Sequence, residues 1–314
     1  MAAAAFISGD WGTTHLRLVL CDSQGAALEI AEGPGAAAVS GAFADTFLAL
    51  TALWRRQHGE LPAVLCGMVG SSFGWIKVPY VHCPARGEDI ARALARVDKH
   101  DAVIAPGLLC KNRFGAPDVL RGEETQILGA IRAEPRLRHG RHLICLPGTH
   151  TKWVVLEDSI VRDFLTAPTG ELYAIIRQHS VLIGATETSR AQGSAFARAV
   201  RHCMRQSCVD VLHLLFECRS RQLLGDLSPM DASDYLSGLL IARDVAGAMN
   251  LYGHMVSPDF PVTLIGTESL TSLYATALRM LDIESFVLDG AAASRLGCAQ
   301  LLSFLQGKPC DHAA

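Results

Sequence analysis

Apolar and polar positions alternate in short blocks through the first part of the chain. Apolar runs at 4–9, 15–21 and 26–32 predict three strands that form a meander. Apolar residues then recur at helical spacing from Phe43 to Trp54, and a compact apolar run at 63–70 predicts a buried strand that enters a glycine turn. We therefore expect the chain to open with a sheet and a helix.

Helical and extended patterns continue to alternate up to a charged segment. Residues 87–97 and 121–131 have the spacing of amphipathic helices, and 101–107 between them predicts a strand. Two glutamates near the start of 121–131 suit a helix N-terminus, where negative charge is favourable. The charged segment 132–141, which contains a proline, is the best candidate for a boundary between two halves.

The second half repeats the layout of the first. Residues 142–158 predict a strand, a Gly-Thr turn and another strand, and helical patterns dominate 171–249. The segment 228–231 is typical of a helix start, with an N-cap serine, a proline at the first position and an acid at the third. Residues 260–281 and 284–302 each predict a strand, a glycine turn and a helix. Only the layout is duplicated, because no sequence repeat of fixed period is present.

Composition and charge limit the class of ligand. Half of the 314 residues are hydrophobic and 19% are charged, as in globular proteins without long disordered segments. The formal net charge of −3 provides no overall attraction to nucleic acid or to a membrane surface. We therefore expect a small metabolite as ligand, held by a local site, and neither nucleic acid nor membrane as partner.

The cysteines and the apolar stretches indicate a cytoplasmic location. Ten cysteines are scattered without a CxxC pair, and most lie in apolar runs, where a thiol behaves as a small hydrophobic group. The first residues lack the basic region of a signal peptide, and no stretch of about 18 apolar residues is present for a membrane span. We expect free thiols in a reducing compartment.

Residues 190–221 are rich in arginine, which raises the alternative of a nucleic-acid surface. Phe196, Met204, Leu212 and Phe216 are interleaved at helical spacing. This pattern favours packed helices with a solvated charged face.

Four glycine turns after apolar strands carry the candidate chemistry. In such turns glycine lets the backbone approach a ligand, and N–H groups and threonine hydroxyls can donate to phosphate oxygens. Any one of them, taken alone, is more often an ordinary turn. The four turns lie at Asp10–Thr14, Pro147–His150, Gly266–Ser269 and Gly290–Ala292.

The order and separation of the turns resemble the sugar kinases of the actin, hexokinase and Hsp70 superfamily. Six segments are more narrowly similar to the bacterial 2-dehydro-3-deoxygalactonokinases: DWGTTHLR, CGMVGSSFGW, RGEETQILGA, LPGTHTKW, TGELY and SGLLIARDV. This resemblance covers essentially the whole chain. In the superfamily's terms, phosphate 1 is 9–17, connect 1 is 121–131, phosphate 2 is 146–153, the adenosine loop is 264–274 and connect 2 is 289–297.

The resemblance implies an α/β, two-lobed, actin-like ATPase fold of the ribonuclease H type. Each lobe is expected to be a mixed sheet flanked by helices, with the nucleotide in the cleft between lobes. Residues 1–132 would form the N-terminal lobe, with phosphate 1 and the sugar-acid site. Residues 133–314 would form the C-terminal lobe, with phosphate 2, the adenosine motif and a last helix that returns toward the cleft.

The implied activity is ATP-dependent phosphorylation of the terminal hydroxyl of 2-dehydro-3-deoxy-D-galactonate to the 6-phosphate, in galactonate and galactose catabolism. The implied small-molecule partners are ATP and the sugar acid, and the resemblance leaves open whether the chain forms a homodimer. Two alternatives stay open on the same loops. One is a polyphosphate or nucleotide phosphohydrolase, and the other is a nucleotide-switched binding protein of the actin or Hsp70 type.

The resemblance places Asp10 near the Mg²⁺ of ATP, through a water molecule. A carboxylate and a polyphosphate repel each other unless a hard cation lies between them, so Asp10 implies a metal. Lys152 is included among the nucleotide-binding residues, with a solvated strand residue as its alternative. The implied nucleotide-binding residues are Gly12, Thr13, Thr14, Gly148, Thr149, His150, Lys152, Gly266, Thr267 and Gly290.

Two positions depart from the superfamily pattern. Phosphate 2 usually begins with an acidic residue, whereas Leu146 and Pro147 precede Gly148 here. The adenosine loop usually carries a pair of glycines, whereas this chain has Gly266 and Thr267. A second carboxylate near the metal is therefore missing from the motif, and the nucleotide contacts of the adenosine loop are less defined.

Connect 1 supplies the candidate base for the acceptor hydroxyl. Glu123 and Glu124 stand at the N-terminal end of the predicted helix, where either could accept the proton, and the resemblance leaves open which one does. The alternative is a solvated acidic pair that favours the helix dipole. Candidate sugar-acid-binding residues are Arg121, for the carboxylate, with Gly70, Ser71, Ser72 and Trp75, the last with core packing as its alternative.

Overall fold

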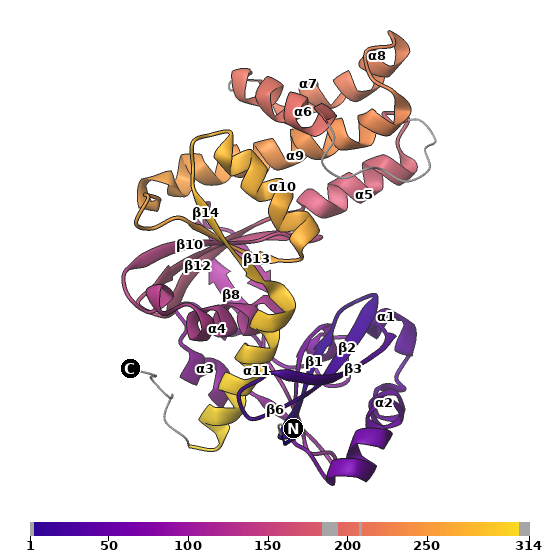
Figure 1. Cartoon of the computed structure of the whole chain (residues 1–314), viewed down its shortest axis with the longest axis vertical. Helices are drawn as coiled ribbons and strands as arrows, with labels where there is room; N and C mark the ends of the chain where they lie inside the picture. Colours follow the sequence, from indigo (N-terminus) through magenta and orange to yellow (C-terminus); the bar gives the residue numbers. More distant parts are fainter. Residues whose placement is uncertain (1–2, 184–193, 207–208, 308–314) are drawn as a thin grey trace. The chain divides into compact units, whose positions relative to one another are not determined.

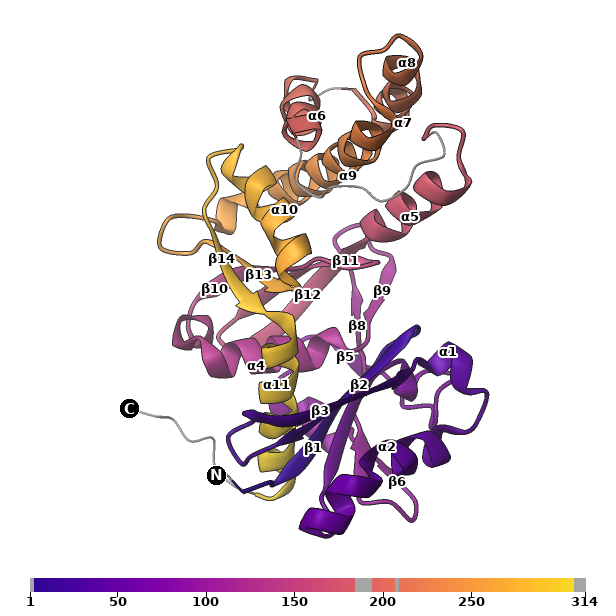
Figure 2. The same cartoon turned by 45° about the vertical axis from the view of Figure 1, so that its right-hand side comes forward.

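A computed structural model describes residues 3–183, 194–206 and 209–307 (Figures 1 and 2). The parts of the arginine-rich segment at 190–193 and 207–208 lie outside the described residues. The chain divides into two compact units. The first contains the chain up to Gly140, Val155–Phe164 and the chain from Leu288, and the second contains Arg141–Val154 and Leu165–Val287.

The first unit is built on a six-stranded mixed sheet in the order β3-β2-β1-β4-β7-β6. β1 pairs with β2 antiparallel and with β4 parallel, so the meander predicted at the start of the chain is confirmed. The strands are β1 (Phe6–Trp11), β2 (His15–Cys21), β3 (Ala27–Pro34), β4 (Ala63–Gly67), β6 (Ala95–Val97) and β7 (Ala102–Ile104).

The core of the first unit lies between this sheet and α2 (Phe43–His58). The residues at helical spacing on α2 include Phe43 and Phe47, which are buried with Trp11 in one apolar cluster. Burial of such large side chains is the main favourable term in folding, at about 25 cal/mol per Å² of apolar surface. The pattern that predicted the helix therefore also predicted its buried face.

α4 (Glu123–Ala133) and α11 (Gly290–Leu305) cross in close contact (Figure 1). A Cβ atom at Gly129 of α4 would lie 1.7 Å from the carbonyl oxygen of Ala293, and one at Gly297 of α11 would lie 1.8 Å from that of Thr125. Only glycine at both positions lets the two backbones approach this far. α11 also packs against β1 and β4, and so links α4 to the strand that carries Asp10.

Two features of the first unit differ from the prediction. The helix expected over 87–97 is α3 (Gly87–Arg92), and Ala95–Val97 instead forms β6, because it pairs antiparallel with β7 at the sheet edge. A three-stranded sheet of β5 (Val81–His82), β8 (Leu108–Lys111) and β9 (Pro117–Leu120) was not predicted. Strands this short have too little alternation for a pattern to detect.

The second sheet has the order β12-β11-β10-β13-β14 and is also mixed, since β10 and β13 run parallel. The predicted pair of strands around 142–158 and the later strand–helix units are confirmed. The unit boundary passes through β11 and β12. The elements are β10 (Arg141–Leu146), β11 (Thr151–Glu157), β12 (Ile160–Ala167), β13 (Val262–Gly266), α10 (Glu268–Arg279) and β14 (Ser285–Asp289).

Helices form the rest of the second unit around α9 (Pro229–Tyr252), which begins as predicted: the Ser228 hydroxyl accepts a hydrogen bond from the Asp231 N–H at 3.1 Å. Leu212 and Phe216, expected to be packed, are 73% and 60% exposed, so this part of the prediction is wrong. α5 (Thr169–His179), α6 (Ser194–Arg205), α7 (Val211–Leu215) and α8 (Glu217–Leu223) all contact α9. Short helices complete the chain: α1 (Ala36–Val39) and the 3₁₀ turns η1 (Met68–Gly70), η2 (Pro135–Arg138) and η3 (Gly253–Met255).

The eight cysteines within the described residues are free thiols, and all but Cys83 are buried. No helix in the described ranges is both long and apolar enough to cross a membrane. The mixed sheets with flanking helices confirm the α/β class.

Candidate functional site

The turn that joins β1 to β2 is fixed by backbone hydrogen bonds from the start of α1. The carbonyl oxygens of Gly12, Thr13 and Thr14 accept backbone hydrogen bonds from residues 35–37. Gly35 permits this contact, because a Cβ there would lie 2.3 Å from the Thr13 carbonyl oxygen. The Gly12 N–H donates to the His15 carbonyl within the turn, so the exposed Thr13 and Thr14, with hydroxyls that can donate, are the residues of this turn that face an anionic ligand most directly.

Asp10, at the end of β1, lies where three segments of the first unit meet. A Cβ at Gly67 would lie 2.8 Å from the Trp11 carbonyl oxygen and 3.3 Å from Asp10 Oδ1, and one at Gly122 would lie 3.4 Å from the Gly67 Cα. Both glycines have positive φ, 89° and 104°, which other residues rarely adopt. The ends of β1 and β4 and the start of α4 therefore converge beside Asp10.

The electrostatics of Asp10 suit a nearby cation. Burial raises the pKa of this carboxyl group, and Arg17, its partner across the β1–β2 pair, only partly opposes the shift. A divalent cation would favour the ionised form. Within the described residues, no three His, Cys, Asp or Glu side chains are grouped to hold a metal. One carboxylate is nevertheless a fitting contribution for Mg²⁺, which keeps several waters and binds substrate phosphates.

Glu123 and Glu124 differ sharply in environment. Glu123 Oε2 accepts a hydrogen bond from the Arg121 N–H at 2.9 Å, and its side chain is partly exposed. Glu124 is fully buried, and its Oε2 accepts from the Gly122 N–H at 2.6 Å, while Oε1 has no partner among the described residues. Burial, and next the charge of Glu123, raise the pKa of Glu124 to about 8. The alternative of a solvated pair does not hold for Glu124.

Arg121 is packed into the first unit with part of its hydrogen-bonding capacity unused. Nη2 donates to the Val78 carbonyl at 2.8 Å, and the guanidinium lies 4.4 Å from the centre of the Tyr80 ring. Nε and Nη1 are buried and lack an acceptor in the part of the chain that is described. A Cβ at Gly70 would lie 2.7 Å from Nη1, so Gly70 makes room for this side chain.

The remaining predicted sugar-acid residues differ in their surroundings. The Ser71 hydroxyl, next to Gly70, is buried without a partner among the described residues, whereas Ser72 is exposed. Trp75 packs against the rings of Trp11 and Phe47, with centroids 6.4 and 5.8 Å away. This contact favours the core-packing alternative for Trp75, and its role as a wall for the sugar acid stays a prediction.

In the second unit, the Pro147–His150 turn is fixed by the start of α5. A Cβ at Gly170 would lie 2.3 Å from the Gly148 carbonyl oxygen, and the Glu171 N–H donates to the Thr149 carbonyl at 2.9 Å. The His150 Nε2 and Glu171 Oε2 atoms are 3.0 Å apart. Glu171 thus places a carboxylate beside a turn whose own sequence lacks one.

The other predicted nucleotide-binding residues lie on several elements. Lys152 is buried on β11 and donates to Thr166 Oγ1 at 2.9 Å, so the alternative of a solvated lysine is wrong. A Cβ at Gly266 would lie 3.5 Å from the Pro147 carbonyl oxygen, which brings the adenosine loop to the phosphate 2 turn, and Thr267 is the N-cap of α10. Gly290 begins α11 in the first unit.

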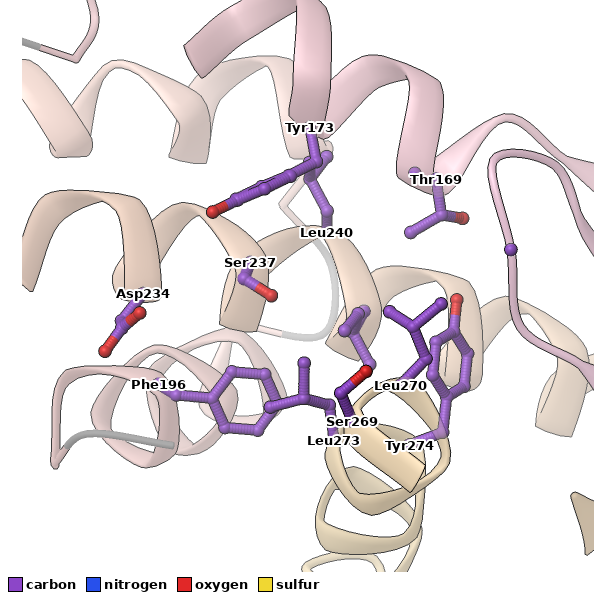
Figure 3. Close-up of a pocket in the computed structure, with 13 residues that line it drawn as sticks. Thr169, Tyr173, Phe196, Asp234, Ser237, Leu240, Ser269, Leu270, Leu273 and Tyr274 are labelled. Carbon is purple, nitrogen blue, oxygen red and sulfur yellow. The ribbon is translucent and has the colours of Figure 1, made fainter. Parts of the chain in front are cut away.

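A cavity of about 270 Å³ lies in the second unit beside Gly148 (Figure 3). Thr169 and Tyr274 lie at one side, and Asp234 and Phe196 at the other, with mostly apolar side chains between (Figure 3). Because Gly170 contacts Gly148, the glycine turn belongs to the Thr169 side. Such a largely apolar cavity with a few polar groups is the usual form of a small-molecule site.

Asp244 is the residue that sequence reasoning missed. It lies on α9, and its carboxylate accepts hydrogen bonds from the side chains of Trp153, Thr169 and Tyr274. Burial raises the pKa of Asp244, and these hydrogen bonds oppose the shift. The segment SGLLIARDV, which ends just after Asp244, carries part of the family resemblance, but no pattern in the sequence indicates the partners of the carboxylate.

Comparison with known sequences gives a consistent family. The model of the 2-keto-3-deoxy-galactonokinase family matches residues 10–301. The chain is 38% identical over 304 residues to "Probable 2-dehydro-3-deoxygalactonokinase DgoK1" of Rhizobium meliloti, with 94% of this chain and 95% of that protein covered. It is 32% identical over 295 residues to the 2-dehydro-3-deoxygalactonokinase of Escherichia coli, with 94% and 96% covered.

Solved structures confirm the predicted actin-like ATPase fold. A crystal structure from Sinorhizobium meliloti, described as that of an inferred 2-dehydro-3-deoxygalactonokinase, superposes with a TM-score of 0.85 at 35% identity and covers 96% of this chain and 99% of that one. The activator of 2-hydroxyisocaproyl-CoA dehydratase from Clostridium difficile, solved with bound ADPNP, has a TM-score of 0.51 at 11% identity, covers 96% and 94%, and supports the fold alone.

Proposed function

Because the chain belongs to the 2-keto-3-deoxy-galactonokinase family, we propose that it transfers the γ-phosphoryl group of ATP to the terminal hydroxyl of 2-dehydro-3-deoxy-D-galactonate. The product is the 6-phosphate, an intermediate of galactonate catabolism. A cytoplasmic location fits the free thiols of the described chain.

The observation that carries the proposal is a set of buried polar atoms without partners in the first unit. Arg121 Nε and Nη1, Ser71 Oγ and Glu124 Oε1 lack hydrogen bonds within the described ranges. Leaving such groups unpaired costs about 1–3 kcal/mol each, so they indicate a polar ligand. A sugar acid offers matching partners, because its carboxylate can accept hydrogen bonds from Arg121 and its hydroxyls can pair with Ser71 and Glu124.

In this arrangement Glu124 is the base. A buried carboxylate at the start of α4 can accept the proton of the attacking hydroxyl while the phosphoryl group moves through a loose transition state. Arg121 fixes the acid end of the substrate, and positioning of this kind supplies much of the catalysis. Asp10 would hold Mg²⁺, which supplies charge neutralisation at the phosphates.

The cavity of the second unit supports an adenine nucleotide as donor. The phosphates of the nucleotide would lie at the Gly148 and Thr149 turn, and its adenine ring would extend toward Phe196 and Asp234. The cavity wall at that end pairs an aromatic ring with a hydrogen-bond acceptor, which suits a base with an amino group.

A coupled ADP assay tests the activity. We expect turnover with 2-dehydro-3-deoxy-D-galactonate above that with the gluconate-derived epimer or simple hexoses. Absence of turnover on any keto-deoxy acid rejects the substrate class. Phosphate release without an acceptor supports the phosphohydrolase instead, and ATP turnover indifferent to every small acceptor supports a nucleotide-switched binding protein.

A further inference from the structure

One carboxylate, that of Asp244, joins three elements of the second unit. Asp244 Oδ1 accepts from Trp153 Nε1 at 2.8 Å, and Oδ2 accepts from Thr169 Oγ1 at 2.7 Å and from the Tyr274 hydroxyl at 2.6 Å. The Tyr274 hydroxyl also lies 2.8 Å from Thr151 Oγ1. Strand β11, the start of α5 and helix α10 are therefore tied to one residue of α9.

The tied elements are the ones that shape the cavity beside the glycine turn. Thr169 and Tyr274 both line the cavity, at the side nearest Gly148 (Figure 3). The residue after Thr169 is Gly170, which contacts the Gly148 carbonyl. A shift of Thr169 would therefore move the turn as well as the wall.

We propose that Asp244 is a positioning residue for the nucleotide, which sets the affinity of the cavity by holding Thr169 and Tyr274 in place. The proposal rests on the proposed function, because it takes the cavity of the second unit to be the nucleotide site. Asp244 does not line the cavity. It acts through the two side chains that do.

A carboxylate is the group that suits this position. Ionised, it only accepts, and here it meets two hydroxyl donors and an indole N–H, which cannot accept. Asparagine could face the indole with its oxygen and the hydroxyls with its amide, because hydroxyls can reverse their roles. Alanine would leave the indole N–H and the hydroxyls with no acceptor in this position, at about 1–3 kcal/mol for each buried group left unsatisfied.

The chain offers a matched control for the tyrosine. Tyr235 is fully buried in the same unit, and its hydroxyl also donates to a carboxylate, Glu217 Oε2, at 3.2 Å. It does not line the cavity. Tyr274→Phe and Tyr235→Phe therefore both remove a hydrogen bond from a tyrosine hydroxyl to a carboxylate. Only the first removes it from a residue that lines the cavity.

The experiment measures ADP affinity by calorimetry for the full chain, with thermal melting and the KM of the sugar acid measured in parallel. We expect Tyr274→Phe and Thr169→Val to weaken ADP binding by about 3- to 10-fold, Asp244→Ala by more than 10-fold and Asp244→Asn by less than 3-fold. Tyr235→Phe is expected to lower the melting temperature with unchanged ADP affinity. The KM of the sugar acid is expected to stay within twofold throughout.

Two results separate the possible failures. If the wild-type chain binds ADP and the folded Tyr274→Phe and Thr169→Val variants bind it equally well, Asp244 has a structural role only and this inference is overturned. If the wild-type chain binds no adenine nucleotide, the proposed function fails, and the inference fails with it. The two single variants keep the test decisive even where Asp244→Ala does not fold.

Discussion

Glu124 combines full burial with a carboxyl oxygen that has no hydrogen-bond partner within the described chain. A neutral carboxyl group tolerates this position better than a charged one, which is why its pKa lies at about 8. The neighbouring Glu123 is partly exposed and bonded to the Arg121 backbone. Adjacent residues of one type thus lie in different environments, and the consequences of the burial of Glu124 can be measured.

The first prediction concerns stability against pH. Between the unfolded pKa near 4.5 and the folded pKa of about 8, the unfolded chain has released the Glu124 proton while the folded chain keeps it. The free energy of unfolding should therefore fall as pH rises through this window, by at most about 1.4 kcal/mol per pH unit. Glu124→Gln should remove this slope. Urea titrations from pH 5 to pH 8 measure it, and parallel curves for variant and wild type contradict the assigned environment.

The second prediction concerns activity. Glu124→Gln should lower kcat by about 10²- to 10⁴-fold, the usual worth of a general base, because glutamine cannot accept the proton. In the wild type, kcat/KM should rise with pH as Glu124 ionises. Glu123→Gln is the matched variant and should retain most activity. If it loses activity and Glu124→Gln does not, the base is Glu123.

At the scale of elements, the crossing of α4 and α11 links the start of α4 to the rest of the first unit. The two glycines at the crossing place backbone against backbone, so the position of Glu123 and Glu124 depends on the contacts of α4 at Thr125 and at Gly129. Tight packing of this kind transmits small changes, because protein interiors yield little.

A pair of glycine-to-alanine changes tests this contact. Gly129→Ala should destabilise the fold by about 3 kcal/mol or more, since its Cβ would overlap the Ala293 carbonyl oxygen. Gly247→Ala is the control, because Gly247 lies within α9 and nothing is found within 4 Å of its Cβ position. This change should stabilise by about 0.5–1 kcal/mol. Denaturant unfolding gives both values, and equal effects would show that the crossing is looser than described.

Prediction from sequence succeeded at the level of elements where a pattern is local. The meander of β1 to β3, the start of α9 at Ser228 and the glycine turns all depend on residues a few positions apart. β6 was misassigned because its pairing with β7 outweighs a helical pattern. Asp244 was missed because its partners Trp153, Thr169 and Tyr274 lie 91, 75 and 30 positions away, and no local pattern marks such a contact.

At the scale of the whole molecule, the candidate residues are divided between the two units. Asp10, Arg121 and Glu124 belong to the first unit, and Gly148 with the cavity belongs to the second. Under the proposed function, the predicted sugar-acid residues therefore all lie in the first unit, and the cavity proposed for the nucleotide lies in the second.

Hydrogen exchange of the full chain tests this division. ADP alone should slow amide exchange at 147–150, at the start of α5 and in α10, because these segments surround the cavity. The sugar acid alone should slow exchange at 69–72 and 121–124 instead. Mass spectrometry of peptic peptides resolves these segments. Protection of 69–72 by ADP alone would contradict the assignment of each ligand to its unit.

The free, buried cysteines give each unit its own chemical reporter. Cys21, Cys66 and Cys298 lie in the first unit, and Cys145 and Cys218 in the second, all inaccessible to solvent. A thiol-specific alkylating reagent reaches such side chains only when the surrounding structure opens, so its rate of labelling measures that opening. The natural chain can therefore be followed unit by unit during denaturation, without an added dye or an engineered label.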